Sequence, residues 1–140
     1  MPIDSPPPLP PAPPAIVVRA PLATLHLEVA TTQSQRELGL MDRSVLPANT
    51  GMLFVFDADG PVDFWMKDTL VPLDMIFIAG DGTVRKVFAR VPTVAPSLPD
   101  GRIPLEAGNA RYVIELPAGE AATDGIVPGT KLPDVTSQRG

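Results

Sequence analysis

One short segment of this sequence places an indole between an acid and a base. Asp63, Trp65 and Lys67 alternate with apolar residues over positions 62–67. If this segment is extended, these three side chains share one face and the apolar ones share the other. The charged face could stack a sugar ring or planar ligand on the indole and hydrogen-bond its edge. The alternative is a half-buried Trp65 packed under a helix, with the methylenes of Lys67 lying along it.

Two arginines near this segment widen the candidate site. Arg36 and Arg43 flank the end of an expected helix and, with Lys67, could clamp a carboxylate or a phosphate. They could instead pair with Asp68 and Asp74 and pin the helix to a sheet. We favour this structural interpretation, because Asp68 and Asp74 bracket a proline-containing turn in which carboxylates often cap backbone amides.

Several chemistries find little support in the sequence. The chain has no cysteine and only one histidine, His26, so thiol catalysis and a multi-histidine metal site are excluded. Asp57 and Asp59 superficially resemble a calcium loop, but the glycine comes too early for an EF-hand and an apolar strand precedes it. Acid–base catalysis by two of the aspartates at 63, 68 and 74 is possible, although spacing alone does not support it. We expect no metal and no cofactor.

The charge distribution is acidic and uneven. The formal net charge is −5, and the segment from Asp57 to Asp81 contains six aspartates against the single Lys67. Phosphate binding needs clustered lysine and arginine, so we expect no nucleic-acid partner. The aspartates are typical of a solvated face with turn residues, rather than of a cation site or a surface for a basic partner.

The N-terminal region differs sharply from the rest. Nine of the 19 prolines lie in the first 21 residues, and proline can join neither a helix interior nor a central strand. We expect a disordered tail over residues 1–15, one domain over 16–133 and a frayed end over 134–140. The tail is either a spacer, which we favour, or a ligand for a proline-reading partner. No apolar run is long enough to span a bilayer, and no signal peptide is visible.

One helix must position the arginines. Ser34 and Glu37 fit a capping box, with Thr31 or Thr32 as alternative caps, and the helix should reach Met41 with Leu38 and Met41 facing inward. A shorter helical turn is expected over 119–123.

Short strands should carry the remainder of the domain. Alternating or continuous apolar patterns predict strands over 16–18, 22–30, 52–56, 62–66, 73–79, 84–91, 112–116 and 130–132. Asp59-Gly60 and residues 80–83 should be turns, and 92–104 a loop. His26 falls on the outward face of its strand. We therefore expect an α+β, mostly-β fold, a twisted antiparallel sheet or partly open barrel with one main covering helix.

The central blocks resemble a known family. Its motifs appear here in order as Arg36-Glu37-Leu38-Gly39-Leu40-Met41, Gly51-Met52-Leu53-Phe54-Val55-Phe56, Phe64-Trp65-Met66-Lys67-Asp68-Thr69, Pro72-Leu73-Asp74-Met75-Ile76-Phe77 and Tyr112-Val113-Ile114-Glu115-Leu116-Pro117-Ala118-Gly119. Over about residues 22–132 the chain is similar to the family called domain of unknown function 192. Two positions depart from the family pattern, which more often has Asn at 68 and Asp at 130. These departures put in doubt any role that needs a neutral amide at 68 or an acid at 130.

The resemblance implies a small α+β domain, often behind a signal or membrane anchor in bacteria, and it brings no established reaction. We therefore expect an extracytoplasmic location, without excluding the cytoplasm. Our leading hypothesis is a non-catalytic binding domain that recognises a polar small molecule, a glycan or a partner protein. The alternatives are a hydrolase or lyase that uses Asp68 or Asp74 with Lys67 and Arg43, and a structural component of an envelope complex.

Overall fold

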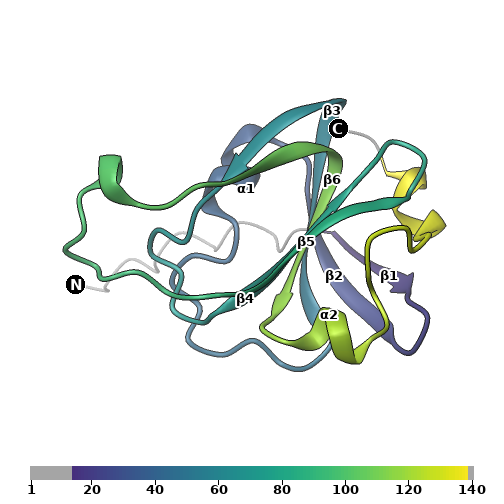
Figure 1. The fold of residues 1–140 in the computed structure, drawn as a ribbon, viewed down its shortest axis with the longest axis horizontal. Coiled ribbons are helices and arrows are strands. Elements are labelled where there is room, and N and C mark those ends of the chain that lie inside the picture. Colours follow the sequence, from purple (N-terminus) through teal and green to yellow (C-terminus); the bar gives the residue numbers. More distant parts are fainter. Residues whose placement is uncertain (1–13, 139–140) are drawn as a thin grey trace, which may run out of the picture.

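A single mixed sheet of six strands forms the domain. The computed structural model describes residues 14–138, in which the strands run in the spatial order β1-β2-β3-β6-β4-β5 (Figure 1). Their bounds are β1 Ala15–Arg19, β2 Thr24–Ala30, β3 Thr50–Phe64, β4 Leu73–Ile78, β5 Val84–Val91 and β6 Glu106–Pro117. The expected α+β, mostly-β class is confirmed, and the sheet does not close into a barrel. One detail of the expectation is wrong, because β2 and β3 pair in parallel while every other neighbouring pair is antiparallel.

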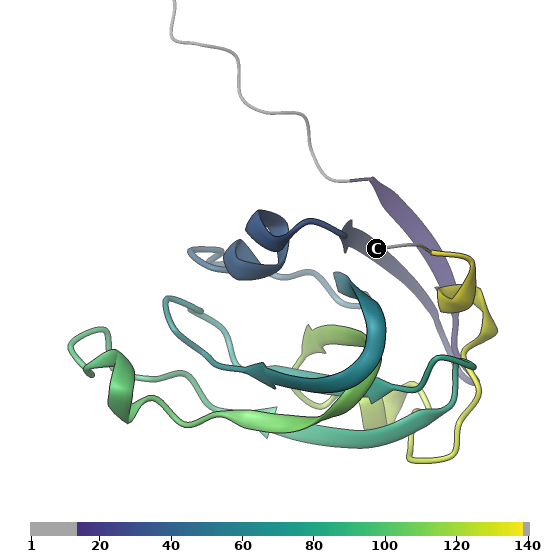
Figure 2. The same ribbon diagram turned by 90° about the horizontal axis from the view of Figure 1, so that it is seen from above.

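The sheet curls because β3 is a single long, bent strand. We expected two strands separated by a turn at Asp59-Gly60, and this prediction is wrong. The pairing with β6 jumps from Val55 opposite Tyr112 to Gly60 opposite Ala110, so β3 carries extra residues across the bend. Extra residues on one strand bend it and increase its local twist. Figure 2 shows β3 and β6 curving together, with α1, Gln33–Leu38, on the inner side of the bend.

The two faces of the sheet bury different cores. The first is mostly aliphatic and includes Leu27, Ile76 and Ile114, with α2, Glu120–Thr123, and the short 3-10 helix η2, Pro133–Ser137, packed against it. The second lies inside the curl and contains phenylalanines and methionines, among them Phe54 and Met75. Alternating residues of β3, β4 and β6 supply the two cores, as the pleat of a sheet requires.

Helix α1 is shorter than its sequence pattern suggests. Its N-cap is Thr32, whose side chain accepts from the amide of Gln35 while the Gln35 side chain reaches back to the cap, so the capping box predicted from Ser34 and Glu37 is wrong. The helix ends at Leu38, which is 60% exposed, and Leu40 is the buried residue instead. Gly39, at a φ of 50°, closes the helix in a backbone conformation that side chains disfavour.

The ends of the domain are tied to its sheet. The predicted disordered tail lies almost entirely outside the described residues, although Ala15 already belongs to β1. We expected residues 134–140 to fray, but Val135 is fully buried and Asp134 binds both the backbone and the guanidinium of Arg19. Between residues 14 and 138, no helix is long and apolar enough to cross a membrane.

Candidate functional site

A pocket of about 270 Å³ opens between α1 and the inside of the curled sheet. It is bounded by α1 and the turn that follows it, by the middle and the C-terminal end of β3, and by Glu115 of β6. Its lining residues are Gln33, Arg36, Glu37, Leu38, Gly39, Leu40, Met41, Phe54, Phe56, Asp63, Phe64, Trp65, Thr69 and Glu115. The volume lies near the lower end of the range for small-molecule sites, about 300–1,000 Å³.

Aromatic side chains form much of the wall. Phe54, Phe56, Phe64 and Trp65 all line the pocket, and the Phe54 and Phe64 rings meet edge to face at 4.9 Å between centroids. The predicted strand over 62–66 ends earlier, at Phe64, and the half-buried Trp65 is the first residue beyond it. Trp65 is therefore neither sealed in the core nor on an open strand face. It forms part of the rim of a concave site.

Arg36 connects the helix to the bend in β3. One guanidinium nitrogen donates to the carbonyl of Thr31 at 2.6 Å and to that of Val55 at 2.9 Å. The guanidinium also lies 5.1 Å from the centroid of Phe56. The bond to Val55 of β3 holds α1 over the pocket, and the bond to Thr31 holds the segment that leads into the helix.

Glu115 is the buried acid of the pocket. It lies on β6 between Met52 of β3 and Met75 of β4 in the strand pairing, and only 4% of its surface is exposed. Its carboxyl accepts no hydrogen bond from residues 14–138. Burial, with a smaller contribution from the negative charge of Glu106, raises the pKa of Glu115 to about 8. A carboxyl with this pKa is largely protonated at pH 7 and can both donate and accept a hydrogen bond.

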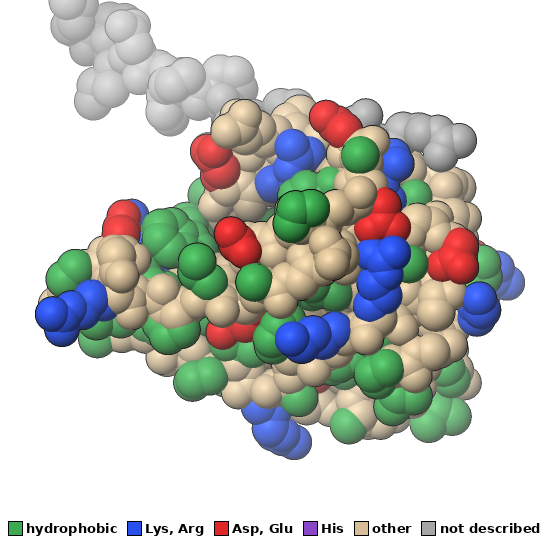
Figure 3. All heavy atoms as spheres, turned by 45° about the horizontal axis from the view of Figure 1, so that its top comes forward, with side chains coloured by type: hydrophobic (Ala, Val, Ile, Leu, Met, Phe, Trp, Pro, Cys, Tyr) green, Lys and Arg blue, Asp and Glu red, His purple; other side chains and the backbone are tan. Residues whose placement is uncertain are grey.

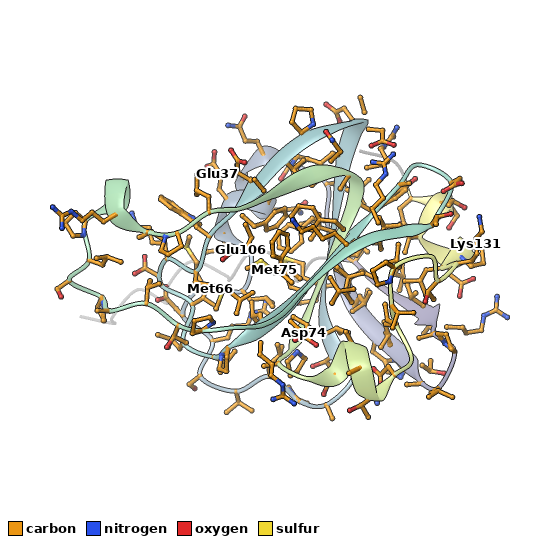
Figure 4. All side chains as sticks on the ribbon, viewed as in Figure 1. Glu37, Met66, Asp74, Met75, Glu106 and Lys131 are labelled. Atoms are coloured by element: carbon orange, nitrogen blue, oxygen red, sulfur yellow. The ribbon has the colours of Figure 1, made fainter. Side chains whose placement is uncertain are left out.

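A second acid lies further along the inside of the same strand. Glu106 lines a smaller pocket of about 100 Å³ together with Met66 and Val91, and Figure 4 shows it pointing into the curl. Its Oε2 has no hydrogen-bond partner among the described residues, and burial raises its pKa. The curl thus brings two poorly solvated carboxyl groups of β6 into mutual electrostatic contact.

The structure separates the other predicted site residues from this pocket. Arg43 pairs with Glu28 of β2. Lys67 binds Asp100 at 2.9 Å and places its ammonium 5.4 Å from the Trp65 ring centroid, but it does not line the pocket. Of the seven predicted residues, the pocket therefore contains Arg36, Asp63 and Trp65.

Asp68 and Asp74 take part in hydrogen bonds with the backbone of other segments, not in the pocket. Asp74 is fully buried and its carboxylate accepts from the amides of Arg90, Gly119 and Ala121 at 2.8–3.0 Å. Asp68 is exposed at a φ of 53°, a conformation that Asn and Asp adopt more readily than other side chains. Its backbone carbonyl accepts from the amide of Asp42. The residues proposed for the hydrolase or lyase therefore do not converge.

The second departure from the family pattern also has a structural explanation. The hydroxyl of Thr130 accepts from the amide of Val127, a contact that an Asp carboxylate could make equally well. An acid at this position is not needed to close the turn.

Basic side chains are dispersed over the surface. Five of them form ion pairs with carboxylates: Arg19, Arg43, Lys67, Arg85 and Lys131. On the face drawn in Figure 3, lysines and arginines are scattered among acidic and hydrophobic side chains.

Sequence reasoning missed Glu115, Glu106 and Glu37. Glu115 carried a signal, since it is the one charged residue in an otherwise apolar strand segment, Tyr112 to Leu116. A strand that is apolar on both faces is buried on both faces, so its acid had to be buried too. Glu106 had no such signal, because it follows the proline-rich loop and precedes a polar stretch.

Similar proteins of known structure share the fold and leave the activity open. A crystal structure from Sinorhizobium meliloti 1021, provisionally described as a transcription regulator, is 36% identical, with a TM-score of 0.77 over 86% of this chain and 94% of that one. A protein of unknown function from Novosphingobium aromaticivorans DSM 12444 is 30% identical, with a TM-score of 0.69 over 84% of this chain and 82% of that one. No curated protein gives a significant match. The model of the family DUF192, described as "Uncharacterized ACR", matches residues 16–133, and the chain belongs to this family.

Proposed function

We propose that this domain is a binding protein for a small molecule, which enters the pocket between α1 and the curled sheet. The observation that carries the proposal is the combination of a concave aromatic wall with one buried, unpartnered carboxyl, Glu115, at the same site. Small-molecule sites are typically apolar clefts with a few convergent polar groups, and a group with a strongly shifted pKa is a further mark of such a site. Trp65 supplies the rim and Glu115 the buried polar anchor.

A binding role fits the pocket better than catalysis. A nucleophile with its base, or two carboxyls that converge within one pocket, would support an enzyme, but Glu106 lines a separate pocket from Glu115. The acids that line the pocket besides Glu115 are Glu37 and Asp63, and both are exposed. The remaining groups expected in a hydrolase or lyase are engaged elsewhere. A structural role in an envelope complex would need an apolar docking surface, and the exposed large hydrophobic residues come from strands, turns and loops in several parts of the chain.

The proposal includes no nucleic-acid partner, although one structural relative is described as a regulator. The net charge of −5 and the pairing of basic side chains with carboxylates both oppose phosphate binding. We also propose an extracytoplasmic location, supported by the proline-rich segment as a spacer. Fractionation of cells that express the full-length gene tests the location.

A thermal-shift screen of small molecules tests the binding function. We expect compounds that raise the thermal unfolding midpoint of the wild-type protein to lose this effect in Trp65→Ala, because the substitution removes the rim of the pocket. The matched control is Phe88→Ala, which truncates a half-buried aromatic residue that does not line the pocket. Ligands that stabilise Trp65→Ala as much as the wild type would refute the proposal, as would a diverse library with no stabilising compound.

A further inference from the structure

The pocket that carries the proposed function also has a charge pattern that points to a class of ligand. Three carboxyl groups line it, those of Glu37, Asp63 and Glu115, against one guanidinium, that of Arg36. Arg36 is already committed to two backbone carbonyls and to the face of Phe56. A ligand that enters the pocket therefore meets an excess of negative charge.

The aromatic wall is suited to a cation that offers few hydrogen bonds. Four of the seven aromatic side chains of the protein line this one pocket. Protein cations already lie against two of these rings, with Arg36 5.1 Å from the Phe56 centroid and Lys67 5.4 Å from the Trp65 centroid. The negative faces of aromatic rings attract cations, and aromatic cages are a known way to bind quaternary ammonium groups.

The buried acid completes the pattern. Glu115 is the buried acid of the pocket, and among residues 14–138 its carboxyl has neither a hydrogen-bond donor nor a basic partner. A buried carboxylate is costly without a partner charge, and an ammonium group inside the pocket would provide one. The volume of about 270 Å³ admits a small amine and excludes a polymer.

We propose that the pocket binds a small alkylated ammonium compound, with its cationic head between the aromatic wall and the Glu115 carboxylate. This inference rests on the proposed binding function and specifies its ligand. The groups that face Glu115 or line its pocket and carry charge are Glu106 on β6, Asp63 on β3, and Arg36 and Glu37 on α1. The residues paired with Glu115 on the two adjacent strands, Met52 of β3 and Met75 of β4, are neutral.

Proton release follows from this arrangement. In the free protein Glu115 holds its proton at pH 7, because burial raises its pKa to about 8. A bound cation favours the ionised form, so the proton leaves to the solvent as the ligand enters. At pH values below the pKa of Glu115 in the free protein, affinity for the cation should increase by up to about tenfold for each unit by which the pH is raised. A neutral ligand that accepts a hydrogen bond from protonated Glu115 would show the opposite trend.

Calorimetric titration with choline and its uncharged isostere 3,3-dimethylbutan-1-ol tests the inference. The two compounds match in shape and differ in the charge of the head group. We expect choline to bind at least tenfold more tightly at pH 8, to gain affinity between pH 6 and pH 8, and to release up to one proton near pH 7, measured in two buffers of different ionisation enthalpy. Glu115→Gln should lower choline affinity at least tenfold and abolish the proton release.

Other outcomes separate this inference from the proposed function. The cation inference is wrong if the isostere binds as tightly as choline. It is also wrong if choline fails to bind at 10 mM and pH 9 while neutral compounds from the thermal-shift screen bind and lose affinity in Trp65→Ala. In either case the binding function stands. If no compound of any charge binds in a way that depends on Trp65, the binding function itself fails. A circular dichroism spectrum of each variant establishes that it is folded before titration.

Discussion

Two buried carboxyl groups lie almost side by side on neighbouring strands and have opposite surroundings. Asp74 of β4 pairs with Leu116 of β6, and the next residue, Met75, pairs with Glu115. The two acids therefore sit one step apart on opposite faces of the same sheet. Asp74 receives three backbone amides, whereas Glu115 receives no hydrogen bond from the described residues.

The comparison shows that burial of an acid does not by itself mark a functional site. The amides around Asp74 come from β5 and from the first turn of α2 with its N-cap, so its charge holds these parts of the chain together. The surroundings of Glu115 are methionine and phenylalanine side chains beside an open pocket. An acid that the protein leaves without partners is available to a ligand, and one that is fully satisfied serves the fold.

The largest expected effect is the loss of the Asp74 carboxylate. Asp74→Asn leaves a single oxygen for three amide donors and turns an NH2 group toward backbone N–H groups. Unsatisfied buried donors cost about 1–3 kcal/mol each, so we expect the free energy of unfolding to fall by about 3 kcal/mol. Urea denaturation measures the change.

The control for this prediction is Asp68→Asn, the same exchange at an exposed position with a left-handed backbone. It should change stability by less than about 0.5 kcal/mol. Equal effects at both positions would contradict the structural role assigned to Asp74.

A smaller and pH-dependent effect is expected at Glu115. Its pKa rises from an ordinary value of 4.5 to about 8 on folding, so the folded state binds the proton more tightly than the unfolded state. The contribution to stability is therefore complete below about pH 4.5 and is lost as the pH rises toward 8. Glu115→Gln should remove this slope and be more stable than the wild type at pH 8, by about 1–3 kcal/mol.

Chemical denaturation at several pH values between 4.5 and 8.5 measures the slope. Glu37→Gln is the matched control, because it removes an exposed carboxyl at the same pocket and should leave the slope unchanged. If the wild type and Glu115→Gln lose stability in parallel over this range, Glu115 does not carry the buried proton.

The smallest effect should come from a third acid, Asp134, whose pKa shifts in the opposite direction to that of Glu115. Asp134 accepts from the backbone and guanidinium of Arg19, and these bonds lower its pKa to about 2. Its contribution is present above pH 4 and is lost as the pH falls toward 2. Because Arg19 is 78% exposed, Asp134→Asn should cost less than about 1 kcal/mol near neutral pH. Thermal unfolding of the wild type and of Asp134→Asn at pH 3 and pH 6 measures the difference in stability. Added salt should reduce this difference, because it screens an exposed ion pair. A loss as large as that of Asp74→Asn would contradict the distinction between buried and exposed acids.

The sequence by itself determined the mostly-β class and most element positions. Alternation along Leu25 to Val29 and the Asp-Gly turn before Val84 are local patterns, and local patterns decide which residues are extended and where tight turns lie. The same reasoning proposed Trp65 as part of a ligand site; Trp65 lines the pocket, and ligand binding there stays a prediction.

Tertiary structure decided everything that depends on distant residues. The parallel pairing of β2 with β3 and the bend that fuses two expected strands into one β3 depend on the partner strands, which no local pattern specifies. The pocket joins α1, β3 and Glu115 of β6 only because the sheet curls. The sequence contains the Glu115 carboxyl, but its proton affinity is set by the groups folded around it, because desolvation depends on the surroundings of an acid and not on the acid itself.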